Sequence, residues 1–267
     1  MIKKDGHIHT PFCPHGTEDL MEEYVLRAID LGFDEISFTE HAPLPEGFTD
    51  PTPDGDSGMK LSRLHSYFSS IDKIKEKFAG EISILTGLEI DYIEGYEKET
   101  ERFLNMWGHL LDDSILSVHF LRTSRGYTCV DYSADVFGEL VEQMGSVLKV
   151  HEMYYETVKA AIKSNLGNYK PKRLGHVTLP RKFQKKYPLE QQAGSLLDSI
   201  LIEVKKHSMV LDFNSAGLRK KDCGETYPPE DIVKKAQLLD IPFTFGSDAH
   251  AAEDVGKDYD LFLRYLA

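Results

Sequence analysis

The chain has 267 residues, of which 41% are hydrophobic, so it is long enough to fill the core of one large α/β barrel or of two modest domains. Its formal net charge of -13 argues against a protein that grips a nucleic-acid backbone, because such proteins usually present a basic face. The three cysteines form no C-x-x-C pair and no disulfide framework, which fits a reducing cytoplasm. No apolar run has the length of a signal peptide or a membrane span, so we expect no membrane association.

Hydrophobic periodicity predicts strands and helices that alternate along the chain. The predicted strands cover residues 2–8, 35–39, 82–89, 115–118, 173–177, 209–213 and 242–246. The predicted helices cover residues 17–32, 61–78, 95–111, 136–148, 154–162, 189–204, 232–239 and 253–266, and Thr17 is the expected cap of the first. Residues 43–58 contain four prolines and three glycines, and we interpret them as a lid or binding loop rather than a passive insertion.

This alternation predicts an α/β protein with a parallel sheet, most simply one that closes into a barrel. In such barrels the loops that follow the strands form the active face, so functional side chains are expected at the C-terminal ends of the strands. The sequence shows no domain boundary, internal repeat or low-complexity segment. We therefore expect a single domain over residues 1–267.

Histidine and carboxylate side chains gather at these predicted strand ends. His7 and His9 are two residues apart on the first strand, so their side chains point to the same side and could share a metal ion. The full set of candidate ligands is His7, His9, His15, His41, Glu89, His119, His176, Asp248 and His250. One zinc-like ion takes about four or five ligands, so this set indicates two or three ions. Glu89 is the natural bridge, because each carboxylate oxygen can bind a different ion. The mixture of imidazole and carboxylate would accept zinc, manganese or iron.

Six short motifs resemble, in order and spacing, those of the PHP family. They are Asp-Gly-His-Ile-His-Thr at 5–10, Thr-Glu-His-Ala-Pro-Leu-Pro at 39–45, Gly-Leu-Glu-Ile-Asp-Tyr at 87–92, Ser-Val-His-Phe at 117–120, Gly-His-Val at 175–177 and Gly-Ser-Asp-Ala-His at 246–250. Within that family the chain is most similar to histidinol-phosphate phosphatases of the PHP type. The motifs that carry this likeness are Pro-Phe-Cys-Pro-His-Gly at 11–16, Leu-Pro-Arg-Lys at 179–182 and Asn-Ser-Ala-Gly-Leu-Arg-Lys at 214–220.

The resemblance implies a distorted seven-stranded (β/α) barrel with a trinuclear metal site. It assigns His7, His9, Glu89 and Asp248 to the first ion, Glu89, His119 and His176 to the second, and His15, His41 and His250 to the third. Metal ions that lie close together lower the pKa of a shared water and neutralise phosphate oxygens during in-line displacement. Glu89, Asp248 and His250 are the expected catalytic residues, and Asp248 or a metal-linked water would protonate the leaving alkoxide.

A phosphate monoester also needs its remaining charge held, and arginine does this through paired hydrogen bonds. Arg181 and Arg219 each follow a predicted strand, so we expect them to bind the substrate. His151 opens a predicted helix, and the sequence leaves open whether it reaches the site.

The predicted function is a metal-dependent phosphomonoesterase that acts on L-histidinol phosphate in histidine biosynthesis. The alternative is a PHP-type nuclease or phosphodiesterase, which the acidic charge and the lack of a basic segment disfavour. A third hypothesis is a non-catalytic domain whose metal site has decayed, but none of the candidate ligands is missing. The expected partner is the small-molecule substrate and not a nucleic acid or a membrane, and the sequence does not indicate an oligomeric state.

Overall fold

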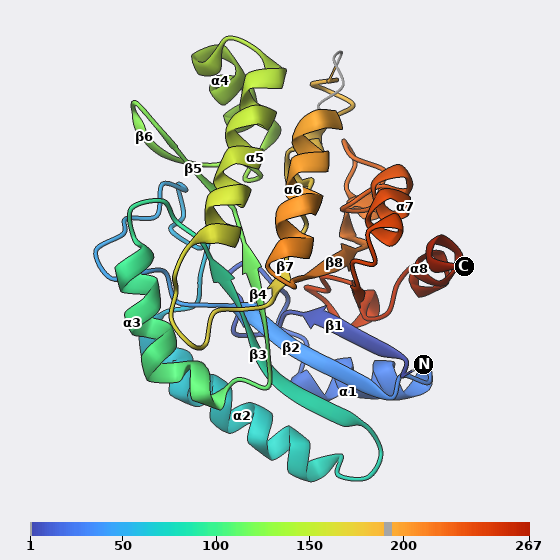
Figure 1. Ribbon diagram of the computed structural model, residues 1–267. Helices are drawn as coiled ribbons and strands as arrows, with labels where there is room; N and C mark the ends of the chain where they lie inside the picture. The colour runs from blue at the N-terminus through green and yellow to red at the C-terminus, as the bar shows by residue number, and fades with distance from the viewer. Residues whose placement is uncertain (1, 190–193) are drawn as a thin grey trace.

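The centre of the molecule is a seven-stranded parallel sheet that curls into a barrel (Figure 1). The computed structural model describes residues 2–189 and 194–267. The strands follow one another around the sheet in the order β1 (Lys4–Ile8), β2 (Glu35–His41), β3 (Ser83–Asp91), β4 (Asp113–Ser117), β7 (Arg173–Leu174), β8 (Val210–Asn214) and β9 (Phe243–Gly246).

The first and last strands meet just beyond their ends. Ile8 forms an isolated parallel bridge with Ala249, and the backbone N–H of His9 donates to the carbonyl of Ala249 at 2.9 Å. Asp248 donates its backbone N–H to the carbonyl of His7 at 2.8 Å. The sheet is thus nearly closed, which confirms the predicted distorted seven-stranded barrel.

Helices surround the sheet as an outer layer (Figure 1). They are α1 (Met21–Asp30), α2 (Leu64–Lys77), α3 (Glu97–Trp107), α4 (Ala134–Met144), α5 (Val147–Lys163), α6 (Gly194–Lys206), α7 (Glu230–Leu238) and α8 (Tyr259–Leu266). Their buried faces are apolar, as in α1 with Tyr24, Val25 and Ala28, and α4 packs on α5 and β6 rather than on the sheet. In the part of the chain that the structure describes, no helix combines the length and apolar character that a membrane crossing requires.

The start of the first helix differs from the prediction. Thr17 does not cap it, because α1 begins four residues later at Met21. The Glu23 carboxylate accepts a hydrogen bond from the backbone N–H of Leu20 at 2.6 Å, which satisfies the helix end. Thr17 instead contacts the segment after β9, where its backbone N–H donates to the carbonyl of His250 at 3.0 Å.

The predicted helices at 136–148 and 154–162 have the wrong boundaries. Gly145 adopts a left-handed conformation with φ 86°, which ends α4. Ser146 then caps α5 by accepting a hydrogen bond from the backbone N–H of Lys149 at 3.2 Å. Apolar residues continue through this turn, so hydrophobic periodicity alone did not locate the break.

Other predicted elements are shorter than expected. The predicted strand at 173–177 is reduced to β7 (Arg173–Leu174), and the closing helix begins at Tyr259 rather than at residue 253. The predicted helix at 189–204 corresponds to α6, and its residues 190–193 lie outside the described residues.

A short antiparallel hairpin, β5 (Phe120–Thr123) and β6 (Gly126–Cys129), was not predicted. It anchors the 43–58 loop, because the Phe48 ring packs against Phe120 and Tyr127 with ring centroids 5.0 and 5.1 Å away. The loop is therefore held over the C-terminal ends of the strands.

Candidate metal centre

A cavity of about 350 Å³ opens at the C-terminal ends of the strands. Candidate ligands form its floor, and the 43–58 loop and the segment after β6 contribute to its walls. The residues that line it are His15, His41, Asp56, Ser57, Glu89, His119, Cys129, Asp131, Tyr132, His176, Leu179, Lys182, Ala216, Lys220, Tyr227, Asp248 and His250.

Glu89 lies at the centre of the candidate ligands. Its Oε2 is 3.5 Å from His7 Nε2, 3.7 Å from His9 Nε2 and 3.1 Å from His41 Nδ1. The other oxygen, Oε1, lies 2.9 Å from His176 Nε2 and 3.9 Å from His119 Nε2. Each carboxylate oxygen thus faces a different group of histidines, as a bridging ligand would.

The remaining candidates complete this arrangement at the rim. Asp248 Oδ1 lies 3.1 Å from His9 Nε2, and its Oδ2 accepts a hydrogen bond from Asn214 Nδ2 at 3.0 Å. The His15 ring lies 5.1 Å from the His41 ring and 5.2 Å from the His250 ring, between centroids. All of the predicted ligands therefore lie together at one end of the barrel.

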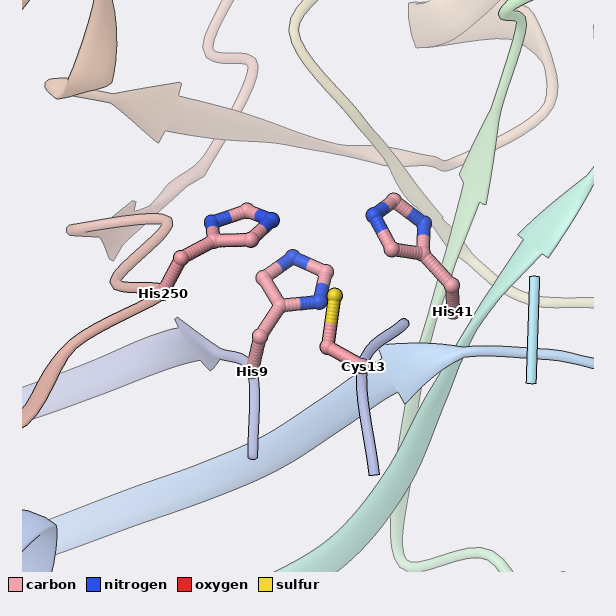
Figure 2. Close-up of side chains that lie close together, drawn as sticks. All are labelled: His9, Cys13, His41 and His250. Carbon is pink, nitrogen blue, oxygen red and sulfur yellow. The ribbon is translucent and has the colours of Figure 1, made fainter. Parts of the chain in front are cut away.

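The donor atoms form three overlapping groups whose members lie within 4.8 Å of one another. The groups are His7, His9 and Glu89; Glu89, His119 and His176; and His9, Cys13, His41 and His250. Figure 2 shows the last group, in which three imidazole rings and a sulfur atom surround one space. The second group matches the expected ligands of one ion. The other two differ from the expectation, because the first lacks Asp248 and the third contains His9 and Cys13 in place of His15.

Several inward-facing nitrogens in this site have no hydrogen-bond partner within residues 2–189 and 194–267. They include His7 Nε2, His9 Nε2 and His41 Nδ1, which belong to buried residues and lie close to carboxylate oxygens. Buried polar atoms are normally satisfied, and a cation among these atoms would satisfy both the nitrogen lone pairs and the carboxylates. The residues present therefore fit a centre of divalent transition-metal ions.

Three further carboxylates hold the outer ring nitrogens. His7 Nδ1 lies 2.8 Å from Asp212, and His119 Nδ1 lies 2.8 Å from Asp91. His9 Nδ1 lies 3.2 Å from Glu40. An ionised carboxylate can only accept a hydrogen bond, so Nδ1 carries the proton. Nε2 is then unprotonated, and its lone pair faces inward, where it can bind a metal ion.

Sequence reasoning assigned no role to these three carboxylates. Glu40 directly precedes a candidate ligand, and Asp91 follows Glu89 by two residues, so position at a strand end could have identified both. Asp212 lies inside β8, and nothing in the linear sequence connects it with His7.

Arg173 extends the contact between Asp212 and His7 towards the opposite end of the barrel. Its side chain is only 4% exposed, with Nη1 3.3 Å from Asp212 Oδ1 and Nη2 2.9 Å from Asp113 Oδ2. Lys4 Nζ lies 3.0 Å from the same Asp113 oxygen. Burial alone would raise the pKa of Asp113, but the adjacent Arg173 and Lys4 cations lower it below its usual value. Arg173 thus holds the Asp212 oxygen that does not contact His7.

The two central carboxylates are ionised. Burial opposes this, yet the surrounding histidines, with His7 foremost, hold the pKa of Glu89 and of Asp248 well below the usual range. Two buried anions next to imidazole lone pairs form a site that attracts cations.

The two predicted phosphate-binding arginines do not line the cavity. Arg181 Nε pairs with the Glu225 carboxylate at 2.6 Å, and Arg219 Nη2 donates to the carbonyl of Ser247 at 2.6 Å. Their place in substrate binding stays a prediction.

Each arginine is followed by a lysine, Lys182 or Lys220, and the cavity wall includes both lysines. In the short 3₁₀ turns η3 (Leu179–Phe183) and η4 (Ala216–Arg219), successive side chains point in different directions, so a lysine can face the cavity when the arginine before it does not. Position after a strand end does not indicate which of the two residues faces the cavity.

His151, which the sequence left open, is buried in α5 rather than in the cavity wall. Its Nδ1 lies 3.5 Å from the hydroxyl of Tyr155, and burial lowers its pKa to about 4. We assign it no part in the site.

Comparison with known proteins agrees with the architecture and the site. Residues 5–216 match the PHP domain, and residues 232–264 match the PHP-associated family. The chain therefore belongs to the PHP family. It is 48% identical to the histidinol-phosphatase of Bacillus subtilis (strain 168), over 98% of this chain and 99% of that protein. It is also 35% identical to a protein of Deinococcus radiodurans named probable histidinol-phosphatase, over 94% of this chain and 88% of that one.

Two solved structures share the fold. The hisK protein of Listeria monocytogenes, to which histidinol phosphatase activity has been ascribed, superposes with a TM-score of 0.94 at 43% identity, over 97% of this chain and 100% of that one. The histidinol phosphate phosphatase of Lactococcus lactis has a TM-score of 0.69 at 21% identity, over 99% of this chain and 94% of that one. That structure holds zinc, L-histidinol and phosphate. At this lower identity it shows only that the barrel is shared.

Proposed function

We propose that this chain is a metal-dependent phosphomonoesterase that hydrolyses L-histidinol phosphate to L-histidinol and phosphate in histidine biosynthesis. The observation that carries the proposal is the position of Glu89, whose two oxygens face separate groups of histidines. The 48% identity to the Bacillus histidinol-phosphatase over nearly the whole chain supports the substrate.

We assign the metal ligands as the family resemblance implies. The first ion would be held by His7, His9, Glu89 and Asp248, the second by Glu89, His119 and His176, and the third by His15, His41 and His250. Ions bound there would supply an activated water at neutral pH and would neutralise charge on the phosphate. Zinc, manganese and iron all suit these donors, and the Lactococcus structure contains zinc.

The protein itself would orient the reaction. Glu89, Asp248 and His250 face the cavity and would surround the reacting phosphate. Asn214 holds Asp248 by donating to its Oδ2, which fixes the other oxygen towards His9. The proton for the leaving alkoxide would come from Asp248 or from a metal-linked water.

The cavity wall offers charges of both signs to the substrate. Lys220 would hold phosphate oxygens and Asp56 would favour the ammonium and imidazole of L-histidinol, whereas Lys182 Nζ pairs with the Asp131 carboxylate at 2.8 Å. The free thiols of Cys13, Cys129 and Cys223 agree with the reducing cytoplasm that we propose as the compartment.

Turnover of three classes of ester tests the proposal. We expect kcat/KM for L-histidinol phosphate to exceed that for a neutral alkyl phosphate of similar size by at least about tenfold, since one charged contact contributes about 1.5 to 3 kcal/mol. Shortening the 43–58 loop should reduce this preference but preserve the rate on a small generic monoester. Equal kcat/KM for the two monoesters would refute the substrate, and faster turnover of a phosphodiester would favour the nuclease alternative.

A further inference from the structure

Cys13 lies inside a group of histidine donors at the rim of the metal centre. Its Sγ and ring nitrogens of His9, His41 and His250 all lie within 4.8 Å of one another. In Figure 2, His41 and His250 point ring nitrogens towards each other, His9 rises between them, and the sulfur lies beside the His9 ring. Cys13 is only 6% exposed, so the thiol is enclosed by protein.

The backbone holds this thiol in place. Residues 10–13 form a turn that contains Pro11, closed by the N–H of Cys13 donating to the carbonyl of Thr10 at 2.9 Å. The N–H of Gly16 then donates to the carbonyl of Cys13 at 3.4 Å. The next residue, Thr17, is bonded to His250, so the turn is fixed against the strand-end segment that carries another donor.

Two features of this group indicate a ligand site rather than packing. His9 Nε2 is buried and has no hydrogen-bond partner among the described residues, and Figure 2 shows it directed between the other rings. Two carboxylates already border this group, since Asp248 Oδ1 lies 3.1 Å from His9 Nε2 and Glu89 Oε2 lies 3.1 Å from His41 Nδ1. A thiolate would add an anionic donor on the side of Cys13, and one sulfur with imidazole nitrogens is an established zinc donor set.

We propose that Cys13 is a ligand of the ion that His41 and His250 would hold, so that this ion has one sulfur donor. The inference rests on the proposed metal centre and adds a ligand to it. On binding, the S–H bond breaks, the proton passes to solvent and a sulfur–metal bond forms, with no change in oxidation state. Thiolate favours zinc over manganese, so this position is zinc-selective.

Cobalt(II) titration of the metal-free protein tests the assignment without reference to turnover. We expect wild type to develop the intense near-ultraviolet absorption of a thiolate-to-cobalt charge transfer as the ion binds. Cys129→Ser is the matched control, because Cys129 is also buried and lines the same cavity. The control should keep the absorption, and Cys13→Ser should lose it. In chelator competition Cys13→Ser should bind zinc at least about tenfold more weakly than wild type. Loss of a residue that only hydrogen-bonds to a metal ligand already weakens metal binding by about this factor, so loss of a direct ligand should weaken it by at least as much.

Persistence of the charge-transfer band in Cys13→Ser, or its absence from wild type that binds cobalt with visible d–d bands, would overturn the proposal. If no cobalt binds to wild type, the proposed metal centre itself fails. Circular dichroism establishes whether metal-free Cys13→Ser is folded. If it is not, zinc-edge X-ray absorption of wild type decides, since a sulfur shell at about 2.3 Å supports the ligand and its absence refutes it.

Discussion

Asp212 and His7 form a buried pair inside the barrel, with Oδ2 of the carboxylate 2.8 Å from Nδ1 of the ring. Both side chains are fully buried, and Arg173 holds the second oxygen of Asp212. The ring is therefore fixed with Nε2 directed at Glu89, and the carboxylate determines which nitrogen can serve as a ligand.

Replacement of Asp212 by Asn should weaken metal binding by about tenfold to a hundredfold, because an amide no longer enforces the proton position on His7. Chelator competition on the metal-free protein measures the affinity. Asp198→Asn is the matched control, since Asp198 is half-exposed and pairs with Lys235, away from the metal centre. An unchanged affinity in Asp212→Asn would remove this residue from the centre.

Glu89→Gln should lower kcat by roughly a hundredfold to a thousandfold and deplete the bound metal, because an amide cannot bridge two cations. Steady-state turnover and metal analysis of the purified protein are the two measurements. The exposed Glu94→Gln serves as the control for a Glu-to-Gln change at the surface. A Glu89→Gln protein with its full metal complement and near-normal activity would show that the bridging role is wrong.

The cavity lysines and the neighbouring arginines can be separated by substitution. Lys220→Ala should lower kcat/KM for the phosphate ester by about tenfold or more and leave the metal content unchanged, because it removes one charged hydrogen-bond donor. Lys221→Ala is the control, being exposed, adjacent and absent from the cavity lining. Arg181→Ala and Arg219→Ala test the prediction made from the sequence. A loss confined to the arginine variants would contradict the assignment to the lysine.

Protonation of Asp113 in acid should lower the stability of the folded protein. The pKa of Asp113 is lower in the folded state than its ordinary value of 3.8, so its stabilising contribution is present above about pH 3.8 and is lost as the pH falls through the lowered pKa. Asp113→Asn should cost about 3 kcal/mol at pH 7, because Arg173 loses a buried partner.

Urea unfolding between pH 7 and acid measures this effect. The difference between wild type and Asp113→Asn should narrow below pH 4, whereas the exposed Asp240→Asn should track wild type throughout. A difference that does not depend on pH would show that the ion pair is not its source.

Removal of the metal should lower the melting temperature. Ions present at about a thousand times their dissociation constant stabilise by roughly 4 kcal/mol, which for a chain of this length corresponds to roughly 10 °C. Calorimetry with a strong chelator, then with excess zinc or manganese, measures the loss and its reversal. Identical melting curves in all conditions would be incompatible with a buried metal centre.

The sequence was sufficient to predict the barrel and the residues that meet at its mouth. Parallel strands bring their C-terminal ends to one edge, so Glu89 and Asp248 could be placed together although they are far apart in the chain. The positions of the strands, and therefore of their ends, could be predicted because buried strands appear in the sequence as short apolar runs.

What the sequence did not predict depends on tertiary contacts. Arg173 occupies a strand that pattern alone describes as apolar, and it is stabilised by Asp113 and Asp212 from neighbouring strands. Arg181 pairs with Glu225, which lies in a distant loop. The β5–β6 hairpin is too short for a clear alternation, and its packing on Phe48 becomes visible only in three dimensions.

The closure of the barrel also determines when the centre can form during protein synthesis. The backbone N–H of Ser247 donates to Asp5 Oδ1 at 3.0 Å, although the two residues are 242 positions apart. The ribosome therefore releases His7 and His9 long before the segment that completes their surroundings. Until the segment after β9 docks, β1 lacks the bridge between Ile8 and Ala249, and an unpaired strand edge can pair with another copy of the chain. Closure of the barrel is thus a late event in the synthesis of this protein, and the N-terminal strand stays exposed to intermolecular pairing until then.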